Sequence, residues 1–173
     1  MTINPILLYF IIFFAKIVEV SMSTLRNVLN TRGEKLKGAC IGFFEVLIWV
    51  ILISNVLGNL SDDPAKLIIY CVAFSLGNYL GVTIENKLAI GTACIQAVVD
   101  MDKREELGEA LRSRGFGVTY IHGEGKDGPV GVVMIYLKRK CVNEVTAQIR
   151  EVCPNAMTTV NDVRNVRNGY IRK

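Results

Sequence analysis

The sequence is poor in the residues that build metal sites and disulfide frameworks. It contains one histidine, His122, and five cysteines, none of them in a Cys-x-x-Cys pair. Such scattered ligands argue against a structural zinc site and a disulfide scaffold. The net charge of +4 comes without a basic cluster interleaved with aromatic residues, which argues against nucleic-acid binding. Because no nucleophile–base pair is visible either, we expect no catalytic residue, no metal, no cofactor and no enzymatic activity.

Hydrophobic residues, in contrast, are abundant and make up 51% of the chain. They concentrate in three runs, over residues 5–25, 39–57 and 67–84. Each run has about the 20 residues that an α-helix needs to cross the hydrocarbon core of a bilayer. Residues 1–90 are therefore predicted to form an α-helical membrane bundle of three transmembrane helices, with the lipid bilayer as its surroundings. Lys16 and Glu19 interrupt the first run, which favours a retained anchor over a cleaved signal peptide.

The loops between these runs differ in charge. The first is basic and the second acidic, their charges coming mainly from Arg26, Arg32, Lys35 and Lys37 and from Asp62 and Asp63. Lysine and arginine near helix ends stay on the cytosolic side of a membrane. The sequence therefore predicts a multi-pass protein of the cell (plasma) membrane, with its N-terminus outside and its C-terminal domain in the cytoplasm.

Five polar side chains form a cluster in the predicted spans, of which Glu19, Glu45 and Asn78 lie at a similar level and Lys16 about one turn deeper. The five are Lys16, Glu19, Arg26, Glu45 and Asn78. At about 1.5 Å per residue, Glu19 lies about 9 Å from the end of its run, and Glu45 and Asn78 lie at a comparable level. An isolated charge there is costly, so each should face a partner or a wet cavity. We expect Lys16 or Arg26 to pair with Glu19 and Glu45 and so hold the helices together. The alternative is an ion, proton or substrate site at this level.

Residues 92–173 change to short alternating elements. Strands are expected over 93–99, 116–122, 130–137 and 157–163, with helices after the first and third strands. Asp102 and Glu105 are expected to form a capping box at the first helix, and Gly115 to follow its end. The order βαββαβ predicts an α+β domain of the ferredoxin-like type. Because so small a domain has a thin core, we also expect a homo-oligomer.

A glycine-rich loop over residues 123–131 is expected between the second and third strands. Its Gly123, Gly125 and Gly128 have the spacing GxGxxG, with Lys126 between them. The dinucleotide fingerprint needs a helix after this string, and here a strand follows, so a Rossmann site is rejected. A backbone nest for a small anionic ligand remains one interpretation. A flexible hairpin loop without a ligand is the interpretation that the sequence favours.

Longer segments of the chain resemble a known family. The segments AKIVEVSMSTLRNVLNTRG, GFFEVLIWV and GNYLGVTIENKLAIG resemble an uncharacterised bacterial family of three-helix integral membrane proteins. The segments RGFGVTYIHGEGKDGPVGVVMIYLKRK and CPNAMTTVNDVRNV are similar to the cytosolic C-terminal domain that this family shares with YitT-type membrane proteins. The resemblance implies a plasma-membrane location and a ferredoxin-like domain. It implies no particular activity, cofactor or catalytic residue.

The features together predict a membrane-anchored regulatory, sensor or interaction protein. Its cytosolic domain would bind a small ligand or a cytosolic protein partner, and the helices would transmit or localise that event. The alternative is a small oligomeric transporter or channel that uses the intramembrane lysine and glutamates.

Overall fold

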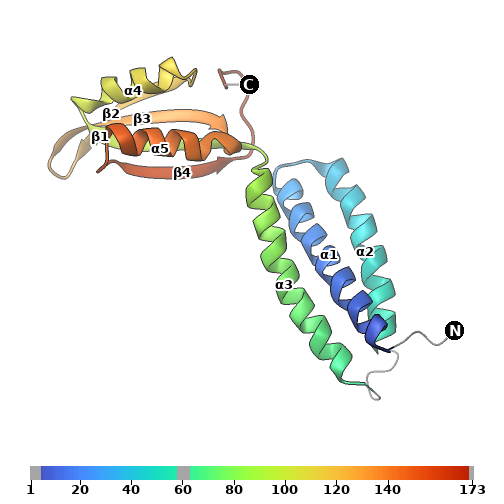
Figure 1. Cartoon of the computed structure of the whole chain (residues 1–173). Coiled ribbons are helices and arrows are strands. Elements are labelled where there is room, and N and C mark those ends of the chain that lie inside the picture. Colours follow the sequence, from blue (N-terminus) through green and yellow to red (C-terminus); the bar gives the residue numbers. More distant parts are fainter. Residues whose placement is uncertain (1–4, 58–62, 172–173) are drawn as a thin grey trace. The chain divides into compact units, whose positions relative to one another are not determined.

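The computed structural model describes residues 5–57 and 63–171, and the chain divides into two compact units, residues 1–88 and 89–173 (Figure 1). Residues 1–4 of the predicted first domain and Asp62 of the predicted acidic loop lie outside the described residues. The first unit is helical and the second contains a sheet with helices, so each is described by itself.

The first unit consists of three long helices, which confirms the predicted membrane fold. They are α1 (Pro5–Thr31), α2 (Lys35–Leu57) and α3 (Ala65–Leu88). All three are long and apolar enough to cross a membrane. Each extends beyond its predicted apolar run, because polar residues at the ends continue the helix. Helix α1 lies between the other two and packs against both of them (Figure 1).

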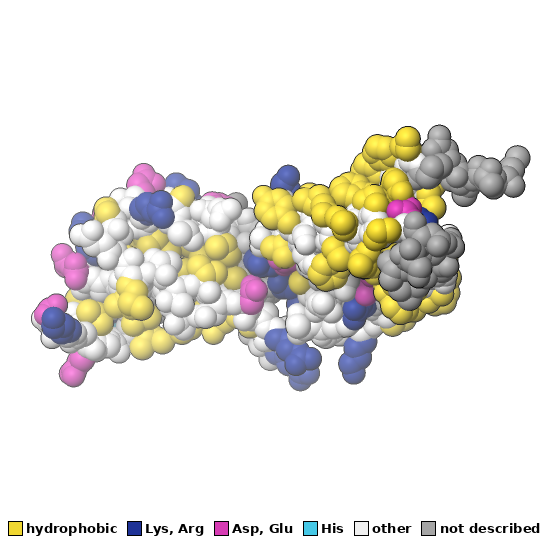
Figure 2. Space-filling model, turned by 90° about the horizontal axis from the view of Figure 1, so that it is seen from below, with side chains coloured by type: hydrophobic (Ala, Val, Ile, Leu, Met, Phe, Trp, Pro, Cys, Tyr) yellow, Lys and Arg dark blue, Asp and Glu magenta, His cyan; other side chains and the backbone are white. Residues whose placement is uncertain are grey.

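The outer surface of this unit is apolar. Large hydrophobic side chains point outward from all three helices, as Phe14, Phe43 and Ile68 do with exposed fractions of 59%, 65% and 66%. Figure 2 shows hydrophobic side chains gathered over the helices on one face of the molecule. A helix that is apolar on all sides is typical of a protein interior or a membrane. Since these side chains are not buried by protein, they fit a lipid surrounding.

The second unit is an α+β domain with the predicted order of elements. It contains β1 (Thr92–Asp100), α4 (Lys103–Ser113), β2 (Val118–Gly125), β3 (Gly128–Lys138), the 3₁₀ turn η1 (Arg139–Cys141), α5 (Val142–Val152) and β4 (Met157–Val163). The strands lie in the order β2-β3-β1-β4, and every neighbouring pair is antiparallel. This is a βαββαβ arrangement, as predicted. The short η1 turn was not predicted.

Alternation along the strands places the core of this domain on one face of the sheet. On β1, Ile95, Ala97 and Val99 are buried, and their cross-strand neighbours on β3 include Val133 and Ile135. Successive side chains of a strand point to opposite faces, so these residues share one face. Helices α4 and α5 cover that face (Figure 1) and complete a single core with the strands.

The predicted capping box is wrong, whereas the predicted end of the same helix is confirmed. Asp102 makes no side-chain capping hydrogen bond, because its backbone is already helical (φ −67°, ψ −30°). An N-cap residue normally has an extended backbone, from which its side chain reaches the first turn. Glu105 instead accepts a hydrogen bond from Arg104 Nη2 at 3.0 Å. Gly115 follows the helix with a φ of +83°, a conformation that favours glycine.

Candidate functional site

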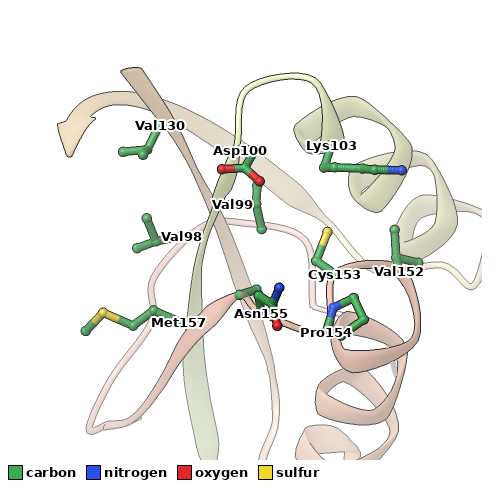
Figure 3. Close-up of a pocket in the computed structure, with 11 residues that line it drawn as sticks. Val98, Val99, Asp100, Lys103, Val130, Val152, Cys153, Pro154, Asn155 and Met157 are labelled. Atoms are coloured by element: carbon green, nitrogen blue, oxygen red, sulfur yellow. The ribbon is translucent and has the colours of Figure 1, made fainter. Parts of the chain in front are cut away.

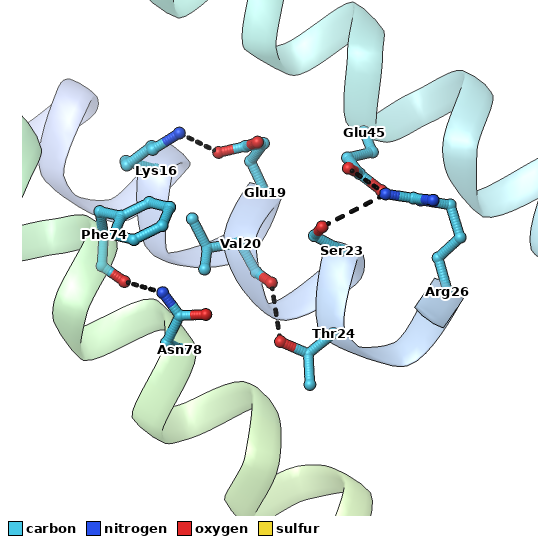
Figure 4. Close-up of polar contacts among 9 residues, drawn as sticks. All are labelled: Lys16, Glu19, Val20, Ser23, Thr24, Arg26, Glu45, Phe74 and Asn78. Atoms are coloured by element: carbon cyan, nitrogen blue, oxygen red, sulfur yellow. Dashed lines mark hydrogen bonds and ion pairs between the residues drawn. The ribbon is translucent and has the colours of Figure 1, made fainter. Parts of the chain in front are cut away.

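A bidentate ion pair joins α1 to α2 (Figure 4). Arg26 donates from Nε to Glu45 Oε2 at 2.6 Å and from Nη2 to Glu45 Oε1 at 3.0 Å. Arg26 Nη2 also lies 3.4 Å from Ser23 Oγ on the same helix. Gly42, one turn before Glu45, leaves room for the Arg26 side chain, since a Cβ there would lie 3.1 Å from Arg26 Cδ. A side chain at position 42 would therefore require the flexible Arg26 side chain to shift slightly.

A second ion pair lies within α1, between Lys16 and Glu19. Lys16 is 3% exposed and Glu19 is 6% exposed. The Lys16 ammonium lies 4.3 Å from the centre of the Tyr70 ring and 5.4 Å from that of Phe74, both on α3. An ammonium over an aromatic face is attracted by the ring quadrupole. Glu19 and two α3 rings thus surround this buried charge.

Asn78, the fifth residue of the predicted polar cluster, does not join these pairs. Its side chain is exposed, and its amide Nδ2 donates to the carbonyl oxygen of Phe74 at 3.1 Å (Figure 4). The structure therefore places Lys16 with Glu19 and Arg26 with Glu45, and leaves the Asn78 amide exposed and bonded to its own helix.

Two glycines let α1 and α3 approach closely. A Cβ on Gly77 would lie 2.8 Å from Val20 Cβ, and one on Gly81 would lie 2.6 Å from Thr24 Oγ1. Ser21 Oγ donates to the carbonyl oxygen of Gly77 at 3.2 Å. Small residues four apart are typical of close helix packing in lipid. These two glycines therefore set how closely the backbones of α1 and α3 approach.

Polar contacts at the ends of the helices were not found from the sequence. At one end, Tyr9 donates to Asp63 at 2.7 Å, and Lys66 lies 3.7 Å from the same carboxylate oxygen. Near the α1–α2 loop, Arg32 lies 3.9 Å from Glu85 of α3. Opposite charges near the ends of two spans are a signal that could have indicated the contact between Arg32 and Glu85.

The predicted glycine-rich loop is largely strand, so its predicted length is wrong. Gly123 and Gly125 lie in β2 and pair with Val130 and Gly128 of β3, which leaves only residues 126 and 127 in the turn. Glycine adopts the extended backbone of a strand as readily as that of a loop, so strand pairing can continue through this segment. Gly128 has a φ of +136°, a conformation that favours glycine, which explains the last glycine of the GxGxxG pattern. The exposed Lys126 is at the tip of this hairpin.

A cavity of about 390 Å³ lies in the α+β domain, where β1 ends and β4 begins (Figure 3). It was not predicted from the sequence. Its wall is mostly apolar, with Asp100 and Lys103 as its charged groups and the Cys153 thiol facing it (Figure 3). The ammonium of Lys103 is 2.7 Å from Glu106 Oε2. Burial raises the pKa of the Cys153 thiol, so it stays protonated and is a poor nucleophile.

Among the described residues, 5–57 and 63–171, no group of side chains is arranged to bind a metal ion. No three His, Cys, Asp or Glu side chains come together there as ligands of one ion. The arrangement of the helical unit is suited to holding helices together, and the cavity of the α+β domain is of the size that small ligands occupy.

Comparison with known proteins identifies the family. Residues 24–82 match the model "Domain of unknown function (DUF5698)", and residues 116–168 match "Uncharacterized protein conserved in bacteria (DUF2179)", the domain shared with YitT-type proteins. A "UPF0316 protein" of Clostridium botulinum strain 657 is 45% identical over 95% of this chain and 98% of its own length. A "UPF0316 protein" of Acetivibrio thermocellus is 38% identical over 98% of this chain and 82% of its own length.

A crystal structure of "a functionally unknown protein from Pediococcus pentosaceus ATCC 25745" is similar to 46% of this chain and 99% of its own, with 16% identity and a TM-score of 0.43. The two relatives span both units, and the two family models match one segment in each. The resemblance seen in the sequence is thereby confirmed, and the chain belongs to the UPF0316 family of membrane proteins.

Proposed function

We propose that this protein is a membrane-anchored regulatory or interaction protein. Its ferredoxin-like domain would lie in the cytoplasm and bind a small ligand or a cytosolic protein, while three helices fix it in the cell membrane as a homo-oligomer. One observation carries the proposal: the charges of Lys16, Glu19, Arg26 and Glu45 are paired with one another, whereas the α+β domain has an open cavity.

The helical contacts support a structural role for the charges. Arg26 and Glu45 use two hydrogen bonds on each other, and Lys16 is enclosed by Glu19 and two aromatic rings. A carrier or channel needs polar groups that are free to exchange partners with a permeating species. Groups held by several contacts at once are better suited to fixing the relative rotation of helices.

The cavity supports a binding role for the α+β domain. Its volume of about 390 Å³ falls within the range of about 300–1,000 Å³ that small-molecule sites have. Val98, Val130 and Met157 provide apolar walls, and Asp100 and Lys103 provide charges that could orient a ligand. These residues come from three strands and one helix, so the binding of a ligand would depend on how these elements pack together.

A thermal-shift experiment on the detergent-solubilised full chain tests this proposal. The probes are inorganic phosphate, dicarboxylates and nucleoside monophosphates, which sample small anions of increasing size. Val98→Trp fills the cavity, and Lys126→Ala removes the cation of the hairpin. A ligand of the cavity should stabilise the wild type and Lys126→Ala but not Val98→Trp. The reverse pattern would move the site to the hairpin, and no shift with any probe would count against small-anion sensing.

The orientation is tested separately, in whole cells. A tag appended after the last residue should resist a membrane-impermeant label until the cells are broken. Labelling from outside intact cells would place the α+β domain outside and contradict the cytoplasmic assignment.

Transport is the second candidate, because Lys16 and Glu19 are deeply buried ionisable groups inside a span. Intramembrane ionisable residues often mark ion or proton pathways. In proteoliposomes, a transporter should show ion flux that Glu45→Gln abolishes and that survives deletion of residues 89–173. Absence of flux in the wild type would leave the structural role.

A further inference from the structure

Helix α3 exposes a polar stripe on its outer surface. Cys71, Ser75 and Asn78 follow one another at steps of four and three, so they lie on one side of the helix. All three are exposed. The stripe is separate from the glycine face, Gly77 and Gly81, that packs against α1. The described residues of this chain therefore bury none of the three.

The stripe lies deep in the span. Asn78 is about 15 Å from the Leu88 end of α3 and about 20 Å from the Ala65 end, at 1.5 Å per residue. Its Nδ2 donates one bond to the carbonyl oxygen of Phe74 at 3.1 Å. Within the described chain, the carboxamide oxygen and the second N–H have no hydrogen-bond partner. Hydrocarbon offers none either, so the exposed amide calls for a polar neighbour.

We propose that a second copy of this chain covers the stripe, with the two α3 helices parallel and the Asn78 carboxamides hydrogen-bonded to each other. All copies enter the membrane in the same orientation, so Asn78 of each lies at the same depth. A carboxamide has both a donor and an acceptor, so it complements itself, which a like-charged pair cannot do. Cys71 and Ser75 are small enough to let the two backbones approach.

This inference rests on the homo-oligomer part of the proposed function and supplies its surface. Cys71 is a natural probe for it. The other exposed cysteine, Cys40 on α2, is first replaced by serine so that it cannot contribute. Copper-phenanthroline oxidation and a short bismaleimide are then applied to the full chain in native membranes, and covalent dimers are read on a gel. A Cys71-dependent dimer is expected.

Matched variants assign the role of the amide. Asn78→Leu should lower the dimer yield at least fivefold, and Asn78→Gln, which keeps the carboxamide, should retain it. Asn55→Leu on α2 is the control. Asn55 is also exposed and makes the same backbone bond, from Nδ2 to the carbonyl oxygen of Ile51 at 2.7 Å, but it lies two residues from the end of its helix. Its replacement should leave the yield unchanged.

Native mass measurement in nanodiscs tests the α3 contact separately from the formation of an oligomer. A wild-type dimer that Asn78→Leu converts to monomer supports the inference. A dimer that forms without Cys71 linkage, or that Asn78→Leu leaves intact, overturns this surface while the homo-oligomer remains. A strict monomer overturns both. Linkage of Cys71 to a different membrane protein of the host overturns the choice of a second copy as the partner.

Discussion

The ion pair between α1 and α2 offers a direct test of how the helical unit is held together. Arg26 and Glu45 share two hydrogen bonds, and their side chains are 29% and 12% exposed. Removing one partner of a fully buried pair costs about 3–5 kcal/mol, whereas exposed pairs contribute about 0–1 kcal/mol. Partial exposure places this pair between the two limits. We therefore expect a coupling energy of about 2 kcal/mol, or roughly 30-fold in the unfolding equilibrium.

A double-mutant cycle measures this coupling. The variants are Arg26→Met, Glu45→Met and the double substitution, and the free energy of unfolding is obtained by SDS titration in mixed micelles. Trp49, the one tryptophan of the chain, lies on α2 one turn after Glu45 and reports locally by its fluorescence. Each single substitution leaves a charge without its partner, so the double variant should be more stable than the sum of the two single losses predicts.

The control cycle uses a pair that water reaches. Glu34 and Lys37 form an ion pair of 3.1 Å, with side chains 49% and 69% exposed. Their coupling should be below about 0.5 kcal/mol, as for other exposed pairs. If the Arg26–Glu45 coupling is no larger than this control, the ion pair does not hold α1 to α2, and the structural assignment of these charges fails.

Other sites give predictions that are independent of this pair. Gly77→Val should lower the free energy of unfolding in micelles by about 1–3 kcal/mol, since a Cβ there lies 2.8 Å from a side-chain carbon of α1; Gly42→Ala, which meets only a flexible arginine, should cost less than half of that. Leu107→Ala, in the core of the α+β domain, should cost about 2–5 kcal/mol and leave the helices folded, as urea unfolding followed by circular dichroism would show; loss of both units together would contradict their independence. Cys153 should react with maleimide more slowly than the half-buried Cys141 at pH 7.5, and its rate should rise at higher pH. The reason is that its raised pKa keeps the thiol protonated until the solution becomes more alkaline. Equal rates at pH 7.5 in a mass-spectrometric time course would refute this prediction.

The three membrane helices could be predicted because the signal is local. Length and apolar composition within each run decide whether a helix can span a bilayer, and no contact with another helix is needed for that inference. Predicting which charged residues pair required information from more than one helix. Lys16 and Arg26 could each have paired with either glutamate, and only the relative rotation of α1 and α2 shows that Arg26 meets Glu45.

In the α+β domain, too, local patterns could be predicted, whereas contacts between residues distant in sequence could not. Alternation along the chain predicted the order βαββαβ, because each strand has its own apolar period. The cavity could not be found this way, since Val98, Val130 and Met157 are far apart in sequence and meet only through the pairing of β1 with β3 and β4. The predicted length of the loop between β2 and β3 was wrong for a different reason. Glycine is conformationally permissive, so it fits a loop and a strand end equally well.

Helix α1 explains why the polar residues of the first unit are distributed as they are. It is the one described helix that packs against both others, so a charge on it can be satisfied from either side. Arg26 finds its partner on α2, and Lys16 finds its aromatic rings on α3. Asn78 of α3 is exposed, and among the described residues its amide bonds only to the backbone of its own helix. The charges of Lys16 and Arg26 thus find their partners within one copy, whereas the remaining donor and acceptor of the Asn78 amide are the groups that the proposed contact with a second copy would satisfy.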